Sequence, residues 1–141
     1  MKIKHIAIKV DNMDKAADFY MNTLGLEHVS TIHKEGAKGA RTSKHLTDGY
    51  LDITLIQYAS DASEGYSWAG DGPCIHHIGI EVEDVDGMTK KIKDGGAEIM
   101  SDEGRIPVKF RSPAGPLAEI VPEGRFDQGN LKARDEKVEV A

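Results

Sequence analysis

The sequence of 141 residues has one cysteine, Cys74, and no run of about 18 apolar residues. A single cysteine cannot form an internal disulfide, which agrees with a reducing compartment. The amino terminus does not have the basic-then-apolar pattern of a signal peptide. We therefore expect neither a membrane span nor a signal peptide, and a cytoplasmic protein.

Basic residues are also few, and they do not cluster. There are 18 Lys and Arg against 24 Asp and Glu, which gives a net charge of −6. The lack of a basic cluster argues against nucleic acid or an anionic membrane as the main partner. The hydrophobic content of 39% is typical of a globular protein, and the length fits one domain with a real core.

The chain does contain an internal repeat. Residues 5–10 (His-Ile-Ala-Ile-Lys-Val) and residues 77–82 (His-Ile-Gly-Ile-Glu-Val) are nearly identical, with an offset of 72, the difference between 77 and 5. Further along, Gly25 pairs with Gly96, so one deletion reduces the offset to 71. Two copies in a chain of this length must share one core.

The first copy begins with a strand over residues 2–10, because apolar and polar-capable positions alternate there. One face has Ile6, Ile8 and Val10, and the other has His5, Ala7 and Lys9. A helix follows, with an N-cap at Asp11 or Asn12 and a stop at Gly25. Three further strands are predicted over 26–33, 40–46 and 50–57.

The second copy repeats this order. We predict strands over 74–82, 97–101, 105–111 and 117–121, and a helix over 85–93. The fold class is therefore α+β: two tandem βαβββ modules, about 1–57 and 74–122, form one domain over 1–122. The mixed sheet would curve around a shared cavity with the helices outside. Residues 58–73 read as a linker, and 123–141 as a loose polar tail that could dock in an oligomer.

The repeat also predicts a site. Alternation places His5 and His77 on the face opposite the isoleucines that pack under the helices, so both imidazoles should point into the cavity. The last strand of each copy adds a carboxylate, Asp52 or Glu119. A buried Glu119 would be costly unless it is paired or bound to a metal. Two histidines and two carboxylates form a donor set for a divalent metal.

The remaining histidines are given less specific roles. A lone strand histidine is usually a surface residue or a satisfied core residue, and only His5 and His77 share a matched register. Alternation places His76 on the other face, where it would pack or support the site from behind. We expect His28, His33 and His45 to be solvated or at the rim of the pocket.

These motifs resemble the vicinal oxygen chelate superfamily over residues 3–122. The resemblance is carried by the two histidine segments, by Phe19-Tyr20, by Leu24-Gly25-Leu26, and by the closing Ser-Pro-Ala-Gly-x-Leu-Ala-Glu. It implies one divalent metal ion (Zn, Ni, Co, Mn or Fe) bound by His5, Asp52, His77 and Glu119. It also implies a homodimer, and a small substrate whose vicinal oxygens bind the metal while an enediolate or related oxyanion is stabilised.

Within this superfamily, the order His, acid, His, Glu is most similar to glyoxalase I. Our main expectation is therefore a glyoxalase I-like isomerase or lyase, in which Asp52 and Glu119 both bind the metal and carry the proton. Asp at position 52 departs from the Glu of glyoxalase I and from the Gln of the epimerase. Lys9 stands where glyoxalase I typically has an arginine near the glutathione carboxylate, so the thiol carrier is open.

Three alternatives stay open. The run 72–77 resembles the double histidine of methylmalonyl-CoA epimerase, but residues 39–45 contain no glutamate for its second acid/base. An extradiol dioxygenase would use His5, His77 and Glu119 for iron; Asp52 would then be surplus, and that family's catalytic tyrosine and histidine cannot be placed. A non-catalytic binder, similar to the bleomycin resistance proteins, would not need the metal ligands.

Overall fold

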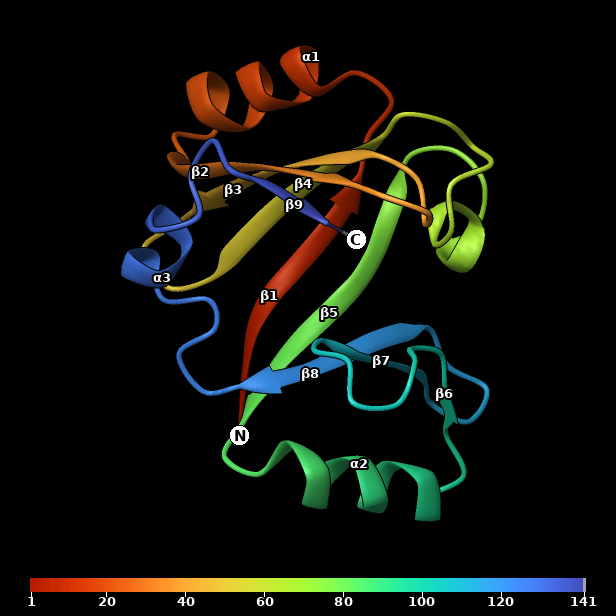
Figure 1. Cartoon of the computed structure of the whole chain (residues 1–141). Helices are drawn as coiled ribbons and strands as arrows, with labels where there is room; N and C mark the ends of the chain where they lie inside the picture. The colour runs from red at the N-terminus through yellow and green to blue at the C-terminus, as the bar shows by residue number, and fades with distance from the viewer. Residues whose placement is uncertain (141) are drawn as a thin grey trace.

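A single curved sheet runs through the protein, whose computed structural model describes residues 1–140 (Figure 1). The strands are β1 Lys2–Lys9, β2 Glu27–Glu35, β3 Arg41–Thr47, β4 Asp52–Tyr58, β5 Cys74–Val82, β6 Glu98–Ile99, β7 Val108–Arg111, β8 Leu117–Pro122 and β9 Val138–Val140. Their order in the sheet is β6-β7-β8-β5-β1-β4-β3-β2-β9. β1 and β5, the first strands of the two copies, therefore lie side by side near its centre.

The two copies adopt the predicted βαβββ order. β1 pairs parallel with β4, and β5 pairs parallel with β8. The first copy contains α1, Met13–Asp18, which continues into a π-helical turn, Phe19–Thr23, and the second contains α2, Val85–Asp94. The side chain of Asn12 accepts a hydrogen bond from the backbone N–H of Lys15, and Asp84 caps α2 in the same way. The sequence prediction of the fold is thus confirmed.

The helices cover the outer faces of the two halves, at opposite ends of the molecule in Figure 1. Under α1, the buried side chains of Leu46 and Leu55 pack against Met13 and Ala17. Under α2, the cluster is built around Phe110 and its neighbours in β5, β7 and β8. Each module has its own apolar layer, which leaves the other face of the sheet free for polar side chains.

The carboxyl-terminal segment is not a loose tail. It forms α3, Gln128–Lys132, and β9, which pairs parallel with β2 and is the edge strand of the sheet. The prediction relied on its polar composition and overlooked two apolar anchors, Leu131 and Phe126, which are 1% and 9% exposed. Within the segment, the guanidinium of Arg134 donates two hydrogen bonds to the Glu139 carboxylate, of 2.7 and 2.9 Å. This carboxylate also lies 3.7 Å from the ammonium of Lys34 in β2, which connects the segment to the sheet.

The linker is ordered as well, and contains a 3₁₀ turn, Tyr66–Ala69. The fully buried ammonium group of Lys9 donates to the carbonyl oxygens of Tyr66 and Gly70, at 2.6 and 2.5 Å, and lies 3.9 Å from the centre of the Tyr66 ring. Lys9 therefore holds the linker against the sheet. Among residues 1–140, no helix is long and apolar enough to cross a membrane.

We predict that Leu131→Ala destabilises the protein by about 2–4 kcal/mol, because it leaves a cavity beneath α3. Val140→Ala is the control, since Val140 is 89% exposed and its truncation should change stability by less than about 0.5 kcal/mol. The free energy of unfolding from urea titration measures both. Equal stability of the Leu131→Ala variant and the unmodified protein would mean that the segment is loose in solution.

Candidate metal centre

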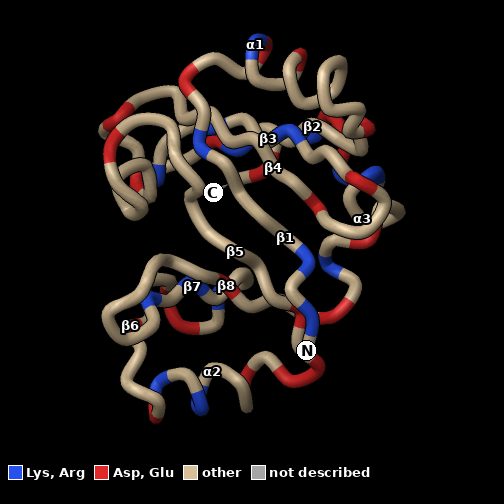
Figure 2. The backbone as a smooth tube through the Cα atoms, turned by 180° about the vertical axis from the view of Figure 1, so that it is seen from behind, with Lys and Arg blue, Asp and Glu red and all other residues tan. Residues whose placement is uncertain are grey.

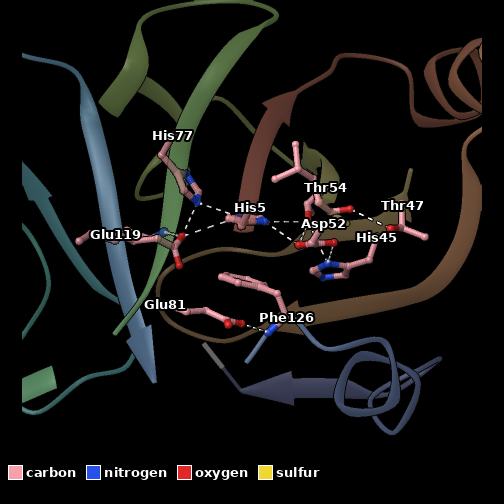
Figure 3. Close-up of polar contacts among 11 residues, drawn as sticks. His5, His45, Thr47, Asp52, Thr54, His77, Glu81, Glu119 and Phe126 are labelled. Carbon is pink, nitrogen blue, oxygen red and sulfur yellow. Dashed lines mark hydrogen bonds and ion pairs between the residues drawn. The ribbon is translucent and has the colours of Figure 1, made fainter. Parts of the chain in front are cut away.

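His5, His77 and Glu119 meet on the concave face of the sheet (Figure 3). They come from the neighbouring strands β1, β5 and β8, and are 4%, 5% and 3% exposed. One ligand atom from each lies within 4.8 Å of the others. The two Nε2 atoms are 3.2 Å apart, and Glu119 Oε1 directly contacts His77 Nε2. The structure thus brings three of the four predicted ligands together.

The far nitrogen of His5 is held by Asp52. Its Nδ1 lies 2.6 Å from Asp52 Oδ2. Burial raises the pKa of Asp52, but hydrogen bonds from His45 and His5 outweigh it and hold the pKa below its usual range. An ionised carboxylate can only accept, so the proton of His5 is on Nδ1. The lone pair of its Nε2 then points toward His77 and Glu119.

A series of hydrogen bonds also determines which ring nitrogen of His77 carries the proton. His76 Nε2 donates to the carbonyl oxygen of Gly65 at 2.7 Å, and its Nδ1 lies 2.7 Å from Nδ1 of His77. Burial lowers the pKa of His76 to about 4, so it is neutral and its Nδ1 can only accept. His77 must therefore donate through Nδ1, which leaves a lone pair on its Nε2 as well.

His76 lies on the same side as His77 because β5 has a bulge. Ala7 is opposite His77, and the next residue of β1, Ile8, is opposite Ile75, so His76 is skipped in the pairing. A bulge of this kind redirects a side chain. The prediction that His76 faces the other way was wrong for this reason, whereas its role in support of His77 fits the observed contact.

Three hydrogen-bond acceptors thus converge without a proton between them. Burial is the main cause that lowers the pKa of His77, to about 3, so a proton is not readily held there. Two imidazole lone pairs and one carboxylate are the usual donors for Zn²⁺ and for the transition metals that bind imidazole and oxygen. The residues therefore fit one divalent metal ion, and hydrogen bonds to the rear nitrogens orient both rings.

Asp52 lies behind His5, away from the other ligand atoms. Besides His5, it accepts hydrogen bonds from His45 Nδ1 at 2.8 Å and from the hydroxyl of Thr54 at 2.8 Å. This position suits a residue that orients His5 and fixes its proton. Its predicted roles as a fourth ligand and as a proton carrier remain predictions.

His45 is not at a solvated rim, because it is 6% exposed and paired with Asp52. The contact joins β3 to β4, where position 45 is opposite Thr54. A pairing between two strands cannot be read from either strand alone. His28 is exposed and His33 half-buried, as expected.

The ring of His5 lies between two further residues that the sequence did not reveal. Phe126 stacks on it, with 4.4 Å between ring centres and 10° between planes. On the sheet side, a Cβ atom at Gly79 would lie 2.7 Å from Cδ2 of His5. Gly79 replaces the Ala7 of the first copy, and a glycine inside a strand is a signal of close approach that could have been used.

Glu119 is held ionised by its neighbours. Burial raises the pKa of its carboxyl, but Lys109 and His77 outweigh burial and hold the pKa well below the usual range. The ammonium of Lys109 lies 2.9 Å from Oε1. The carboxylate is therefore ionised at neutral pH.

The comparisons with known proteins agree with this geometry. Residues 2–116 match the profile of the Glyoxalase/Bleomycin resistance protein/Dioxygenase superfamily. This chain belongs to that superfamily. The resemblance found in the sequence is thereby confirmed.

Two kinds of relative are found within the superfamily. An ethylmalonyl-CoA/methylmalonyl-CoA epimerase of Cereibacter sphaeroides is 32% identical over 120 residues, which are 79% of this chain and 88% of the relative. A lactoylglutathione lyase of Neisseria meningitidis is 26% identical over 106 residues, 74% of this chain and 73% of the relative. A solved methylmalonyl-CoA epimerase of Streptomyces coelicolor, 26% identical, has a TM-score of 0.71 and covers 88% of this chain and 98% of its own.

We predict that the protein retains one divalent metal ion per chain through dialysis, and that His77→Ala loses it. Asp52→Asn should retain the site but weaken metal affinity by about 10- to 100-fold, as loss of an orienting partner does. His33→Ala, outside the site, is the control. Metal content by elemental analysis, and competition with a chelator, measure both effects; full metal retention in His77→Ala would contradict the site.

Proposed function

We propose that this protein is a metal-dependent enzyme that moves a proton at the carbon next to a carbonyl group, on a small substrate with vicinal oxygens. The observation that carries the proposal is the convergence of two imidazole lone pairs and the buried Glu119 carboxylate. A divalent cation bound there would polarise the carbonyl oxygen and make the neighbouring C–H more acidic.

In this proposal Glu119 takes the proton. Its carboxylate is ionised and buried, and it lines the cavity in front of the two histidines. Lys109 and His77 keep it in the base form, and a cation at the site would raise the acidity of the substrate C–H from which it takes the proton. Phe126 and Gly79 hold the ring of His5 in place beside it.

Between the two reactions, we favour an epimerase over the glyoxalase I-like reaction of our main expectation. One epimerase relative is 32% identical, against 24–26% for the lyase relatives, although three mitochondrial epimerases are only 22–24% identical. Several of the similar solved structures are also methylmalonyl-CoA epimerases. In addition, Lys9 is 1% exposed and its ammonium donates to two carbonyl oxygens of the linker, so it is not accessible to a glutathione carboxylate. The proposed substrate is a short-chain acyl thioester with a carboxylate beside its carbonyl group, as the relatives' names indicate.

An epimerase must remove the proton on one face and return it on the other. Residues 39–45 contain no carboxylate, and the cavity-lining residues of β3 are Arg41, Ser43 and His45. Lys34, on the adjacent strand β2, also lines the cavity. Burial and, next, Arg41 lower the pKa of Lys34 to about 8. An amine with this pKa can accept and donate a proton near neutral pH, so we propose Lys34 as the second acid/base.

Three substrates separate the possible reactions. The metal-loaded protein is offered methylmalonyl-CoA in D₂O, methylglyoxal with glutathione, and a catechol in air. Epimerisation with deuterium uptake at the α-carbon is expected. Turnover of the hemithioacetal alone would establish the glyoxalase reaction, oxygen consumption a dioxygenase, and metal binding without any turnover a binding protein.

The variant Glu119→Gln tests the base. The amide keeps the shape and one ligating oxygen, so metal content should persist while turnover falls by roughly 10²- to 10⁴-fold. Glu123→Gln, at an exposed position just beyond β8, is the matched control and should leave the rate unchanged. Full activity of Glu119→Gln would assign the base to another residue.

The variant Lys34→Met tests the second acid/base. If Lys34 serves one face only, one epimer should still exchange its α-hydrogen for deuterium, while conversion between epimers falls by about 10²-fold or more. Deuterium exchange is followed by mass spectrometry, and epimer conversion by chiral separation. Equal loss or equal retention of both processes would contradict a role on one face.

A further inference from the structure

The cavity in front of the metal centre is strongly basic, although the protein has a net charge of −6. Figure 2 shows charges of both signs spread along the chain. The cavity, of about 80 Å³, is lined by His5, His77 and Glu119 together with five basic residues. These are Lys34, Arg41, Lys109, Arg125 and Arg134.

Two of these basic residues lack an acidic partner. Arg134 is paired with Glu139, which also lies 3.7 Å from the ammonium of Lys34, and Lys109 is paired with Glu119. Within residues 1–140, no carboxylate forms an ion pair with the guanidinium of Arg41 or Arg125, and both residues are half-buried. Positive charge is therefore left uncompensated beside the site.

Burial, and next a neighbouring positive charge, lower the pKa of two of these residues. The pKa of Arg125 is lowered by burial and then by Arg134, and that of Lys34 by burial and then by Arg41. Holding partly buried like charges together is unfavourable unless an anion is also bound. A guanidinium is well suited to this anion, because its parallel N–H groups match both oxygens of a carboxylate.

We propose that Arg41 and Arg125 form a carboxylate-binding subsite, which holds a free carboxylate of the substrate beside the site where a metal held by His5, His77 and Glu119 would polarise its carbonyl group. The substrate class rests on the proposed function, but the subsite can be tested without turnover. A cavity of about 80 Å³ takes only a small acyl fragment. A second cavity, of about 100 Å³, shares Lys34, Arg41 and His77 with it and extends toward Trp68, where a longer carrier could leave.

The subsite depends on the carboxyl-terminal segment. Arg125 lies beyond residues 2–116, which match the superfamily. The segment is fixed next to it, where the Phe126 N–H donates to the buried carboxylate of Glu81 at 3.0 Å. We infer that this segment determines selectivity for acidic substrates in this protein.

The test is a binding cycle with malonate and malonamate. Both offer a chelating oxygen to the metal-loaded protein, but malonamate has one carboxylate replaced by an amide. The unmodified protein should bind malonate more tightly, and Arg125→Gln and Arg41→Gln should each reduce that preference by about tenfold or more, the effect of one lost charge-assisted hydrogen bond. Lys132→Gln, an exposed position on the same segment, should retain it.

Titration calorimetry measures the preference for malonate over malonamate, and thermal unfolding confirms that each variant is folded. Because the two arginines come from different elements, failure of one variant to fold leaves the other to decide. An unchanged preference in the folded variants, an equal decrease in Lys132→Gln, or no binding of malonate would overturn the subsite. Loss of preference in a protein that turns over no thioester would support the subsite and reject the proposed reaction, so the two failures are distinguishable.

Discussion

The antiparallel pairing of β1 with β5 is the constraint on which the rest of the structure depends. Ile6 is opposite Ile78, and the two are separated by the same 72 residues as His5 and His77. The pseudo-twofold axis therefore passes between equivalent positions, and side chains that alternation sends to the concave face meet there. A slip of one residue in this pairing would turn every one of them to the other face.

The predictable part of the structure follows from this repeat. The matched register of residues 5–10 and 77–82 predicted that His5 and His77 meet, and the strand pattern of residues 117–121 added Glu119 to them. Both modules followed from the same order of strand and helix patterns after each histidine segment. The prediction from sequence was wrong in two places: where a bulge interrupts strand alternation, and where contacts with distant residues determine the structure of a segment. The bulge at His76 breaks alternation, and Leu131 and Phe126 are two apolar residues in a polar segment whose partners lie far away in the sequence.

The carboxyl-terminal segment and the site depend on each other through the contacts of Phe126. Phe126 stacks on the ring of His5, and its N–H satisfies the Glu81 carboxylate, which would otherwise be an unpaired buried charge. Docking of the segment therefore completes the packing around His5 and places Arg125 in the cavity at the same time. The same docked segment thus packs against the His5 ring and brings the positive charge of Arg125 beside it.

Divergence between the copies explains why two related carboxylates are placed differently. Asp52 is opposite His5 itself in β1, whereas Glu119 is opposite Gly79, two residues beyond His77. Gly79 is in turn opposite His5 across the central pairing, and its missing side chain leaves the space that the His5 ring occupies. The longer Glu119 side chain reaches the shared Nε2 face of the two histidines, while the shorter Asp52 stays at the rear nitrogen of His5. The two acids at the ends of the copies thus occupy different places, with Glu119 beside the Nε2 atom of His77 and Asp52 beside the Nδ1 atom of His5.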